Sequence, residues 1–116
     1  MAGEGLTVGA SERAKGARGE REVADVFRSH GVPADRTVHN SGLYLRGDLT
    51  GVEGYHVEVK RQETLRVPTW LRQAEDECGD LVPVVAFRQN HGEWYAAMRL
   101  TDLARLMSTA ESGEGA

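Results

Sequence analysis

Residues 55–60 read Tyr-His-Val-Glu-Val-Lys, and this stretch decides how the rest of the chain is interpreted. Successive side chains of a β-strand point to opposite faces of the sheet. In this segment the alternation assigns three residues to each face, with Tyr55, Val57 and Val59 on one and His56, Glu58 and Lys60 on the other. The pattern predicts a strand with one face in the core and one polar face free for chemistry.

Asp48 lies upstream of this strand, at a spacing that brings it close to Glu58. If the residues after Gly51 form a hairpin loop, Gly51 pairs with Tyr55 and Asp48 lies directly across from Glu58, with Cβ atoms about 5 Å apart. Two facing carboxylates repel each other unless a cation lies between them, and Mg²⁺ is usually held by a few carboxylates and waters. The spacing therefore predicts a divalent-cation site at Asp48 and Glu58.

Lys60 follows Glu58 by two residues and lies on the same predicted face. Its ammonium group could reach a metal-bound water or a phosphate oxygen, where it would polarise the nucleophile or stabilise charge developing on phosphorus. Aspartate, glutamate and lysine in this arrangement favour hydrolysis of a phosphodiester bond.

Residues 11–30 have helical periodicity and end at Gly31 and Pro33, the usual order at a helix C-terminus. Glu20 lies in the middle of the inward stripe of this helix, and Glu22 points away. Glu20 could supply a third carboxylate to the cation site. The alternative is an ion pair between Glu20 and Arg13 or Arg21. The other residues of the stripe are Arg13, Gly16, Ala17, Val23, Ala24 and Phe27.

The remaining elements complete the order α-βββ-α-ββ-α. Strands are predicted at 36–38, 47–52, 55–60, 82–88 and 94–100, and helices at 11–30, 68–78 and from a cap at Thr101 or Asp102 through Met107. This order predicts an α/β fold with a central mixed β-sheet flanked by helices. We expect one domain over residues 10–107, with glycine-rich flexible tails at 1–9 and 108–116.

Composition narrows the class of protein. With 116 residues, of which 40% are hydrophobic, the chain fits a single core. The one cysteine, Cys78, excludes an intrachain disulfide, and no apolar stretch approaches the length of a membrane span, so a cytoplasmic location is expected. The net charge is −4, but residues 10–72 carry eleven Lys and Arg against nine Asp and Glu. Because a bound divalent cation adds positive charge, this acidic chain can still bind nucleic acid.

Four motifs together resemble a known group of enzymes. Asp48 followed by Glu58-Val59-Lys60 resembles the signature of PD-(D/E)XK nucleases. Within that group, the order of the other three motifs resembles archaeal-type Holliday junction resolvases. These motifs are Lys15-Gly16 followed by Glu20-Arg21, Asn40-Ser41-Gly42, and Gln73-Ala74-Glu75. One departure stands at Arg46-Gly47-Asp48, where a proline commonly precedes the aspartate.

The resemblance implies a restriction-endonuclease-like fold and a metal-dependent, structure-selective DNA endonuclease. As a homodimer, such an enzyme resolves four-way junctions and leaves 5′-phosphate ends. Its cofactor would be Mg²⁺, for which Mn²⁺ can substitute, with no other small-molecule cofactor. The metal ligands would be Asp48, Glu58, the Val59 carbonyl and, directly or through water, Glu20. Lys60 would be the activating residue and Gln73 a further site residue. Residues expected to contact DNA phosphates are Arg13, Lys15, Arg18, Ser41 and Arg46.

Two alternatives remain open from the sequence. One is a DNA nuclease of the same fold without junction preference, acting in recombination, repair or restriction. The other is a catalytically inactive DNA-binding or assembly subunit, although such a subunit need not retain Asp48, Glu58 and Lys60 together. His56 shares the polar face, and a metal-ligand role is the minority interpretation for it. A small chain of this kind could be encoded by a phage and act in the host cytoplasm.

Overall fold

The computed structural model describes the backbone of residues 2–37 and 47–115, and the side chains of residues 14–37 and 47–110. Within these residues the elements follow the predicted order α-βββ-α-ββ-α. They are α1 (Ala2–Ser29), β1 (Asp35–Arg36), β2 (Leu49–Thr50), β3 (Tyr55–Arg61), α2 (Val67–Glu77), β4 (Val82–Arg88), β5 (Tyr95–Ala97) and α3 (Leu100–Gly115). Val38, which the sequence analysis includes in the first strand, lies outside the described residues.

The strands form a mixed three-stranded sheet and a separate two-stranded pair. In the larger sheet the strand order is β3-β4-β5, with β4 parallel to β3 and antiparallel to β5. Helix α2 makes the crossover that a parallel connection requires. Strands β1 and β2 pair antiparallel, with Arg36 opposite Leu49. The predicted mixed sheet with flanking helices is therefore confirmed.

Strand β2 is shorter than the predicted strand at 47–52, and glycines account for both of its ends. Gly47 has a φ of +77° and Gly51 a φ of +79°. A β-strand requires negative φ, so neither residue can continue it. A Cβ atom on Gly51 would also lie 1.9 Å from the carbonyl oxygen of Pro33, so only glycine fits this approach.

The two terminal helices are longer than the sequence analysis expects. Helix α1 begins at Ala2 rather than at residue 11, and α3 continues to Gly115 rather than ending at Met107. Neither extension contains a proline, and adding a residue to an existing helix is far easier than starting one. The expected cap at the start of α3 is also wrong. Asp102 lies inside the first turn, where its carboxylate binds Arg99 and Arg105 at 2.8 and 3.4 Å.

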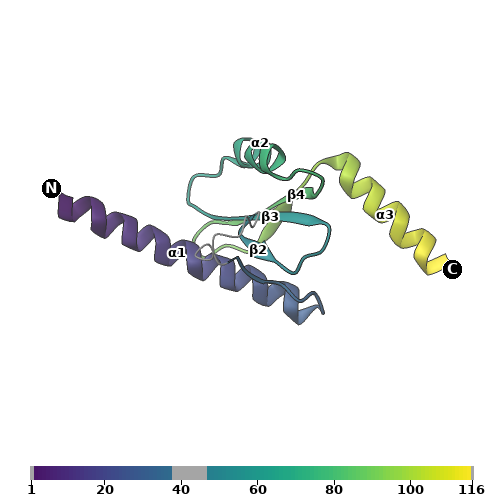
Figure 1. The fold of residues 1–116 in the computed structure, drawn as a ribbon, viewed down its shortest axis with the longest axis horizontal. Coiled ribbons are helices and arrows are strands. Elements are labelled where there is room, and N and C mark those ends of the chain that lie inside the picture. Colours follow the sequence, from purple (N-terminus) through teal and green to yellow (C-terminus); the bar gives the residue numbers. More distant parts are fainter. Residues whose placement is uncertain (1, 38–46, 116) are drawn as a thin grey trace.

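Helices α1 and α2 lie on opposite sides of the strands (Figure 1). Residues of α1 pack against Val57 of β3 and Ala86 of β4 in the larger hydrophobic cluster. Residues of α2 pack against Val85 of β4 in a second cluster, with Trp70 and Ala74 buried. Because side chains alternate along a strand, odd-numbered residues of β3 face α1. Glu58, which pairs with Val85, faces α2.

A cluster of ion pairs connects α1 with the sheet. Glu22 binds Arg88 of β4 at 2.5 Å and Arg61 of β3 at 3.6 Å, and it accepts a hydrogen bond from the indole of Trp94. The expectation that Glu22 points away from the core is therefore wrong. Glu22 lies on the flank of the inward stripe, and its carboxylate meets the long side chains of Arg61 and Arg88 that extend from the strands.

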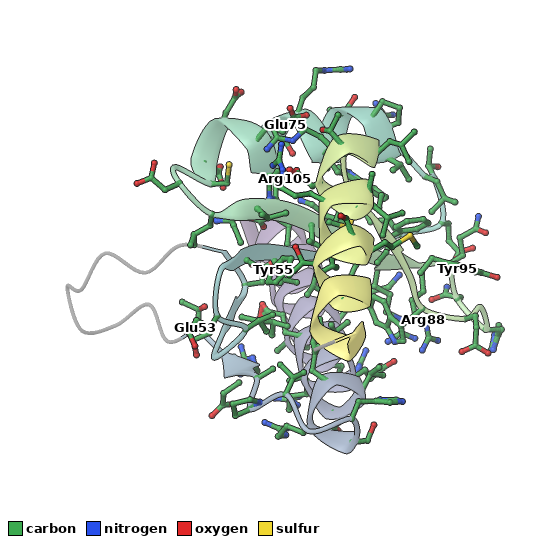
Figure 2. The ribbon with its side chains drawn as sticks, turned by 90° about the vertical axis from the view of Figure 1, so that its right-hand side faces the viewer. Glu53, Tyr55, Glu75, Arg88, Tyr95 and Arg105 are labelled. Atoms are coloured by element: carbon green, nitrogen blue, oxygen red, sulfur yellow. The ribbon has the colours of Figure 1, made fainter. Side chains whose placement is uncertain are left out.

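Helix α3 is joined to α2 at its N-terminal end. Arg99, just before α3, lies 3.6 Å from Glu75 of α2, a residue visible at the junction of the two helices in Figure 2. Beyond that junction α3 extends away from the strands (Figure 1). Among the described residues, no helix is both long and apolar enough to cross a membrane.

Candidate active site

Asp48 lies against the edge of β3, held there by backbone contacts. Its N–H donates to the carbonyl of Val57 at 2.8 Å, and its Oδ2 accepts a hydrogen bond from the N–H of Val59 at 2.7 Å. Gly47 makes this approach possible, because a Cβ atom there would lie 2.9 Å from the oxygen of Val57. Proline fixes φ near −65° and could not adopt the +77° of Gly47. The departure at Arg46-Gly47-Asp48 is thus a requirement of this backbone.

The predicted pairing of Asp48 directly across from Glu58 is wrong by one residue. The hydrogen bond from Asp48 N–H reaches the carbonyl of Val57, and β2 forms its ladder with β1. The positive φ of Gly51 and of Gly54 bends the connection away from a simple hairpin. The two carboxylates are nevertheless neighbours, since Asp48 acts on Glu58 through both its charge and a hydrogen bond.

Glu58 is a partly buried acid whose pKa is strongly raised. Its side chain is 15% exposed. Burial, followed by the charge of Asp48 and then that of Glu77, raises the pKa of Glu58 from 4.5 to about 8. A carboxylic acid surrounded by other acids holds its proton because the charged form is unfavourable there. A divalent cation at this position would reverse the effect by stabilising the charged carboxylates.

Two further side chains border Glu58 on the α2 side. His56 is fully buried, with Nε2 lying 2.8 Å from Oε1 of Glu58 and 3.9 Å from Oε2 of Glu77. One potential ligand atom from each of these three residues lies within 4.8 Å of the others. This set could also hold a cation.

Glu77 is not among the site residues predicted from the sequence, although the sequence contains a signal for it. Glu77 follows the buried Trp70 by seven residues and the buried Ala74 by three, which is the spacing of the inward stripe of α2. As the last residue of the helix it is still 64% exposed. The same reasoning that singled out Glu20 applies to it. Gln73, one turn before Glu77 on α2, is exposed, and its role in the site stays a prediction.

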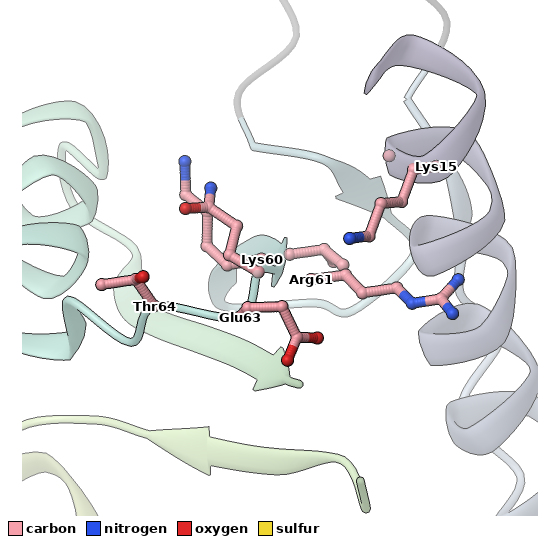
Figure 3. A pocket seen from close by; sticks show the side chains of 8 residues that line it. Lys15, Lys60, Arg61, Glu63 and Thr64 are labelled. Atoms are coloured by element: carbon pink, nitrogen blue, oxygen red, sulfur yellow. The ribbon is translucent and has the colours of Figure 1, made fainter. Parts of the chain in front are cut away.

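A groove of about 560 Å³ opens at the C-terminal end of β3. Lys15 and Gly16 of α1 line one side of it, and residues 59–64 line the other. In Figure 3 Lys15 extends from α1 toward the strand on which Lys60 lies. Ligands of α/β sheets commonly bind at the carboxyl ends of parallel strands, which is where this groove lies.

The cations of the groove differ in their partners. Arg61 is paired with Glu22, whereas the ion pairs of the described residues include neither Lys15 nor Lys60. The carboxylate of Glu63 accepts a hydrogen bond from the N–H of Asn90 at 2.6 Å and is thereby directed to the turn after β4. Two lysines therefore remain available to an anion in the groove.

Glu20 has the inward orientation that the helical stripe predicts. Its side chain is 16% exposed and lies 3.3 Å from Nε of Arg36 in β1. Arg36 of β1 is thus a partner of Glu20 that the helix pattern does not predict. The side chain of Arg13, one of the two predicted ion-pair partners, lies outside the described residues. Glu20 approaches from the α1 side of the sheet and Glu58 lies on the α2 side, and the role of Glu20 as a metal ligand stays a prediction.

The predicted DNA-contacting residues are only partly described. Lys15 lines the groove, and Arg18 is exposed on α1. Ser41 and Arg46 lie outside the described residues, as does the side chain of Arg13. Their contacts with DNA stay predictions.

A family model described as "Phage putative PDDEXK endonuclease" matches residues 11–113, which is most of the chain. The chain belongs to this PDDEXK endonuclease family. Neither the curated proteins nor the solved structures yielded a match. Membership of the PDDEXK family confirms the resemblance to PD-(D/E)XK nucleases and the restriction-endonuclease-like fold. The finer resemblance to archaeal-type Holliday junction resolvases stays a prediction.

Proposed function

We propose that this PDDEXK protein is a DNA endonuclease that depends on a divalent metal ion. Its active site, formed by Asp48, Glu58 and Lys60, would hydrolyse phosphodiester bonds. The observation that carries the proposal is the fixed position of the Asp48 carboxylate. A backbone hydrogen bond from Val59 holds it at the edge of β3, beside the buried Glu58. A carboxylate pair of this kind, in a chain of an endonuclease family, is best explained as a cation site.

The donor atoms fit Mg²⁺ or Mn²⁺. Asp48 and Glu58 offer carboxylate oxygens, the hard donors that both ions favour, and the Val59 carbonyl would add a third oxygen. The neighbouring charges that raise the pKa of Glu58 are those that a cation would compensate. Glu20, already paired with Arg36, would contribute through a water molecule. When bound, the metal supplies Lewis-acid polarisation of the phosphate and of the attacking water.

Lys15 and Lys60 suit the phosphate backbone of DNA. Lys60 extends from the same strand as Glu58, and we assign it to the charge that develops on the phosphate during cleavage. Lys15 enters the groove from α1 and would grip a phosphate without taking part in the reaction. Gln73 would act at the α2 border of the site. Cleavage would leave a 5′-phosphate and a 3′-hydroxyl, as the resemblance implies.

We further propose that the preferred substrate is a four-way junction and that the active form is a homodimer. A junction has two-fold symmetry and needs two incisions, which two identical sites related by a two-fold axis can supply. Arg13, Arg18, Ser41 and Arg46 are the remaining candidates for contacts with the junction arms. Since the family is a phage family, we expect the enzyme to act in the cytoplasm of an infected cell.

The test compares a synthetic four-way junction with a linear duplex of the same arm sequences, each incubated with Mg²⁺, Mn²⁺ or EDTA. We expect paired incisions of the junction that require metal, and much slower cleavage of the duplex. Asp48→Asn should abolish incision. Asp76→Asn, which removes an exposed carboxylate from α2, should cleave as the wild type does.

The other outcomes distinguish the alternatives. Equal cleavage of junction and duplex would indicate a nuclease of the same fold without junction preference. Binding of DNA without incision in any metal would instead indicate a catalytically inactive subunit, and the proposed chemistry would be wrong.

A further inference from the structure

His56 is a buried imidazole directly beside the Glu58 carboxylate. Its side chain is 0% exposed, and its Nε2 lies 2.8 Å from Oε1 of Glu58. This is a hydrogen-bond distance, and an ionised carboxylate can only accept. When Glu58 is charged, the imidazole must therefore carry a proton on Nε2, and this N–H donates a hydrogen bond to Oε1 of Glu58.

The imidazole is enclosed by three parts of the fold. On β4 its register partner is Pro83, which is also fully buried. On the loop before β2, a Cβ atom at Gly47 would lie 3.5 Å from Nδ1 of His56. On α2, Glu77 lies 3.9 Å from Nε2. A ring packed this closely has few orientations open to it, so the direction of its Nε2–H is fixed.

A fixed donor matters because Glu58 lies among other acids. Asp48 and Glu77 both act on Glu58 through charge, and repulsion of this kind favours rotation of a carboxylate away from its neighbours. A hydrogen bond to one oxygen resists that rotation and leaves the other oxygen for a cation. Partners that hold a ligating side chain in this way commonly affect metal affinity or activity by about 10- to 100-fold.

We propose that His56 is a positioning residue that holds the Glu58 carboxylate in place beside Asp48 for metal binding. The inference rests on the proposed function and extends it to a residue outside the signature. In this assignment His56 acts through Glu58 and is not itself a metal ligand, although its Nε2 belongs to a group that could hold a cation. The ring measurement below separates the two roles, because an Nε2 bound to a metal carries no proton.

The experiment compares two amide variants, His56→Gln and His56→Asn, in the full-length protein. A glutamine amide can place an N–H near the position of the histidine Nε2, whereas the asparagine amide is too short to do so. Mn²⁺ affinity is measured by titration calorimetry without DNA, and kcat and KM are measured on the cleaved substrate at saturating Mn²⁺. We expect His56→Asn to bind Mn²⁺ about 10- to 100-fold more weakly, with KM for DNA unchanged. His56→Gln should stay within about threefold of wild type.

The control is His30→Asn, the same substitution at an exposed histidine just after α1, which should bind Mn²⁺ as the wild type does. A folded His56→Asn variant with wild-type Mn²⁺ affinity would overturn the inference and leave the proposed function standing. Wild-type protein that binds no Mn²⁺ would overturn both.

A measurement on the wild type does not depend on the variants folding. Nitrogen chemical shifts of the His56 ring at neutral pH, in the presence of Mg²⁺, report which nitrogen carries the proton. We expect Nε2 to be protonated. An Nε2 without a proton could not donate to Glu58, and the inference would be wrong.

Discussion

The two sides of strand β3 differ in the side chains that they present to the helices. Toward α1, Val57 and Val59 pack into the larger hydrophobic cluster with Val23 and Ala24. Toward α2, the same strand presents Glu58 beside a buried histidine and further acids. Because a strand alternates its side chains, one apolar face can anchor the strand rigidly while the other face holds charged groups in a set position. The comparison suggests that the α1 side provides stability and the α2 side provides chemistry.

The largest effect is expected from Glu58→Gln, which removes a charge from the α2 side. We expect cleavage to fall by about 10³-fold or more, because the metal site loses a ligand charge. DNA binding should be unchanged or stronger, since less negative charge meets the phosphates. Single-turnover cleavage and a binding titration measure the two effects separately.

Two control variants test whether the loss of cleavage is specific to the α2 side. Glu53→Gln removes an exposed carboxylate from the loop before β3 and should leave cleavage unaffected. Val23→Ala, on the α1 side, should lower the free energy of unfolding by about 2 kcal/mol, with cleavage by the folded protein little changed. Near wild-type turnover by Glu58→Gln would mean that the α2 side is not the site.

The two lysines of the groove allow the α1 side and β3 to be compared within one site. Lys60→Ala should lower kcat by about 10²-fold with little change in Mn²⁺ affinity, because its charge is needed in the transition state. Lys15→Ala, on the α1 side, should raise KM and leave kcat within a few fold. Steady-state kinetics on both variants measure this difference. Equal effects of the two substitutions on kcat would show that Lys15 and Lys60 do not divide phosphate binding and catalysis between them.

The raised pKa of Glu58 predicts how the metal-free protein responds to pH. Folded Glu58 keeps its proton up to about pH 8, whereas the unfolded chain releases it near 4.5. Because the folded state binds more protons in this range, its stability is highest below pH 4.5, as far as this group is concerned, and falls as pH rises to 8. Mn²⁺ must displace that proton, so its affinity should increase by up to tenfold per pH unit below 8.

Urea titrations in EDTA at several pH values measure the stability, and calorimetry measures the affinity. Glu58→Gln cannot release a proton and should show a much weaker decline of stability over this range. If the wild type and Glu58→Gln decline in parallel, another group is responsible for the pH dependence.

Local patterns in the sequence were sufficient to predict the element order, the two faces of β3 and the neighbouring positions of Asp48 and Glu58. These features depend on side-chain alternation and on turn residues, both of which are read from adjacent positions. The one-residue shift at Asp48 could not be predicted in this way. It depends on β2 pairing with β1 and on the φ angles of two glycines that leave no periodic signal.

Two contacts that were not predicted join residues that are distant in the sequence. Glu77 reaches His56 across the space between α2 and β3, and Glu22 reaches Arg88, which is 66 residues away in the sequence. Each of these acids lies on or beside an inward stripe, so the sequence marks them as candidates. Which strand residue lies opposite depends on how each helix packs on the sheet, and a single sequence does not encode that in a readable pattern.

The smallest effect on cleavage is expected from Glu20→Gln, which changes a predicted site residue on the α1 side of the sheet. Glu20 is an acid on the α1 side, and its ion pair with Arg36 makes it part of the α1 packing. We therefore expect its loss to lower the free energy of unfolding by about 0.5 to 1 kcal/mol. A double-mutant cycle with Arg36→Gln, measured by urea unfolding in EDTA, isolates the energy of that ion pair from other effects.

If Glu20 also holds a metal-bound water, cleavage by Glu20→Gln should fall by about tenfold, far less than in Glu58→Gln. A gain of stability in EDTA would instead mean that repulsion from Asp48 outweighs the attraction of Arg36. A loss of cleavage as large as that of Glu58→Gln would place a reacting group on the α1 side, so the chemistry would not be confined to the α2 side.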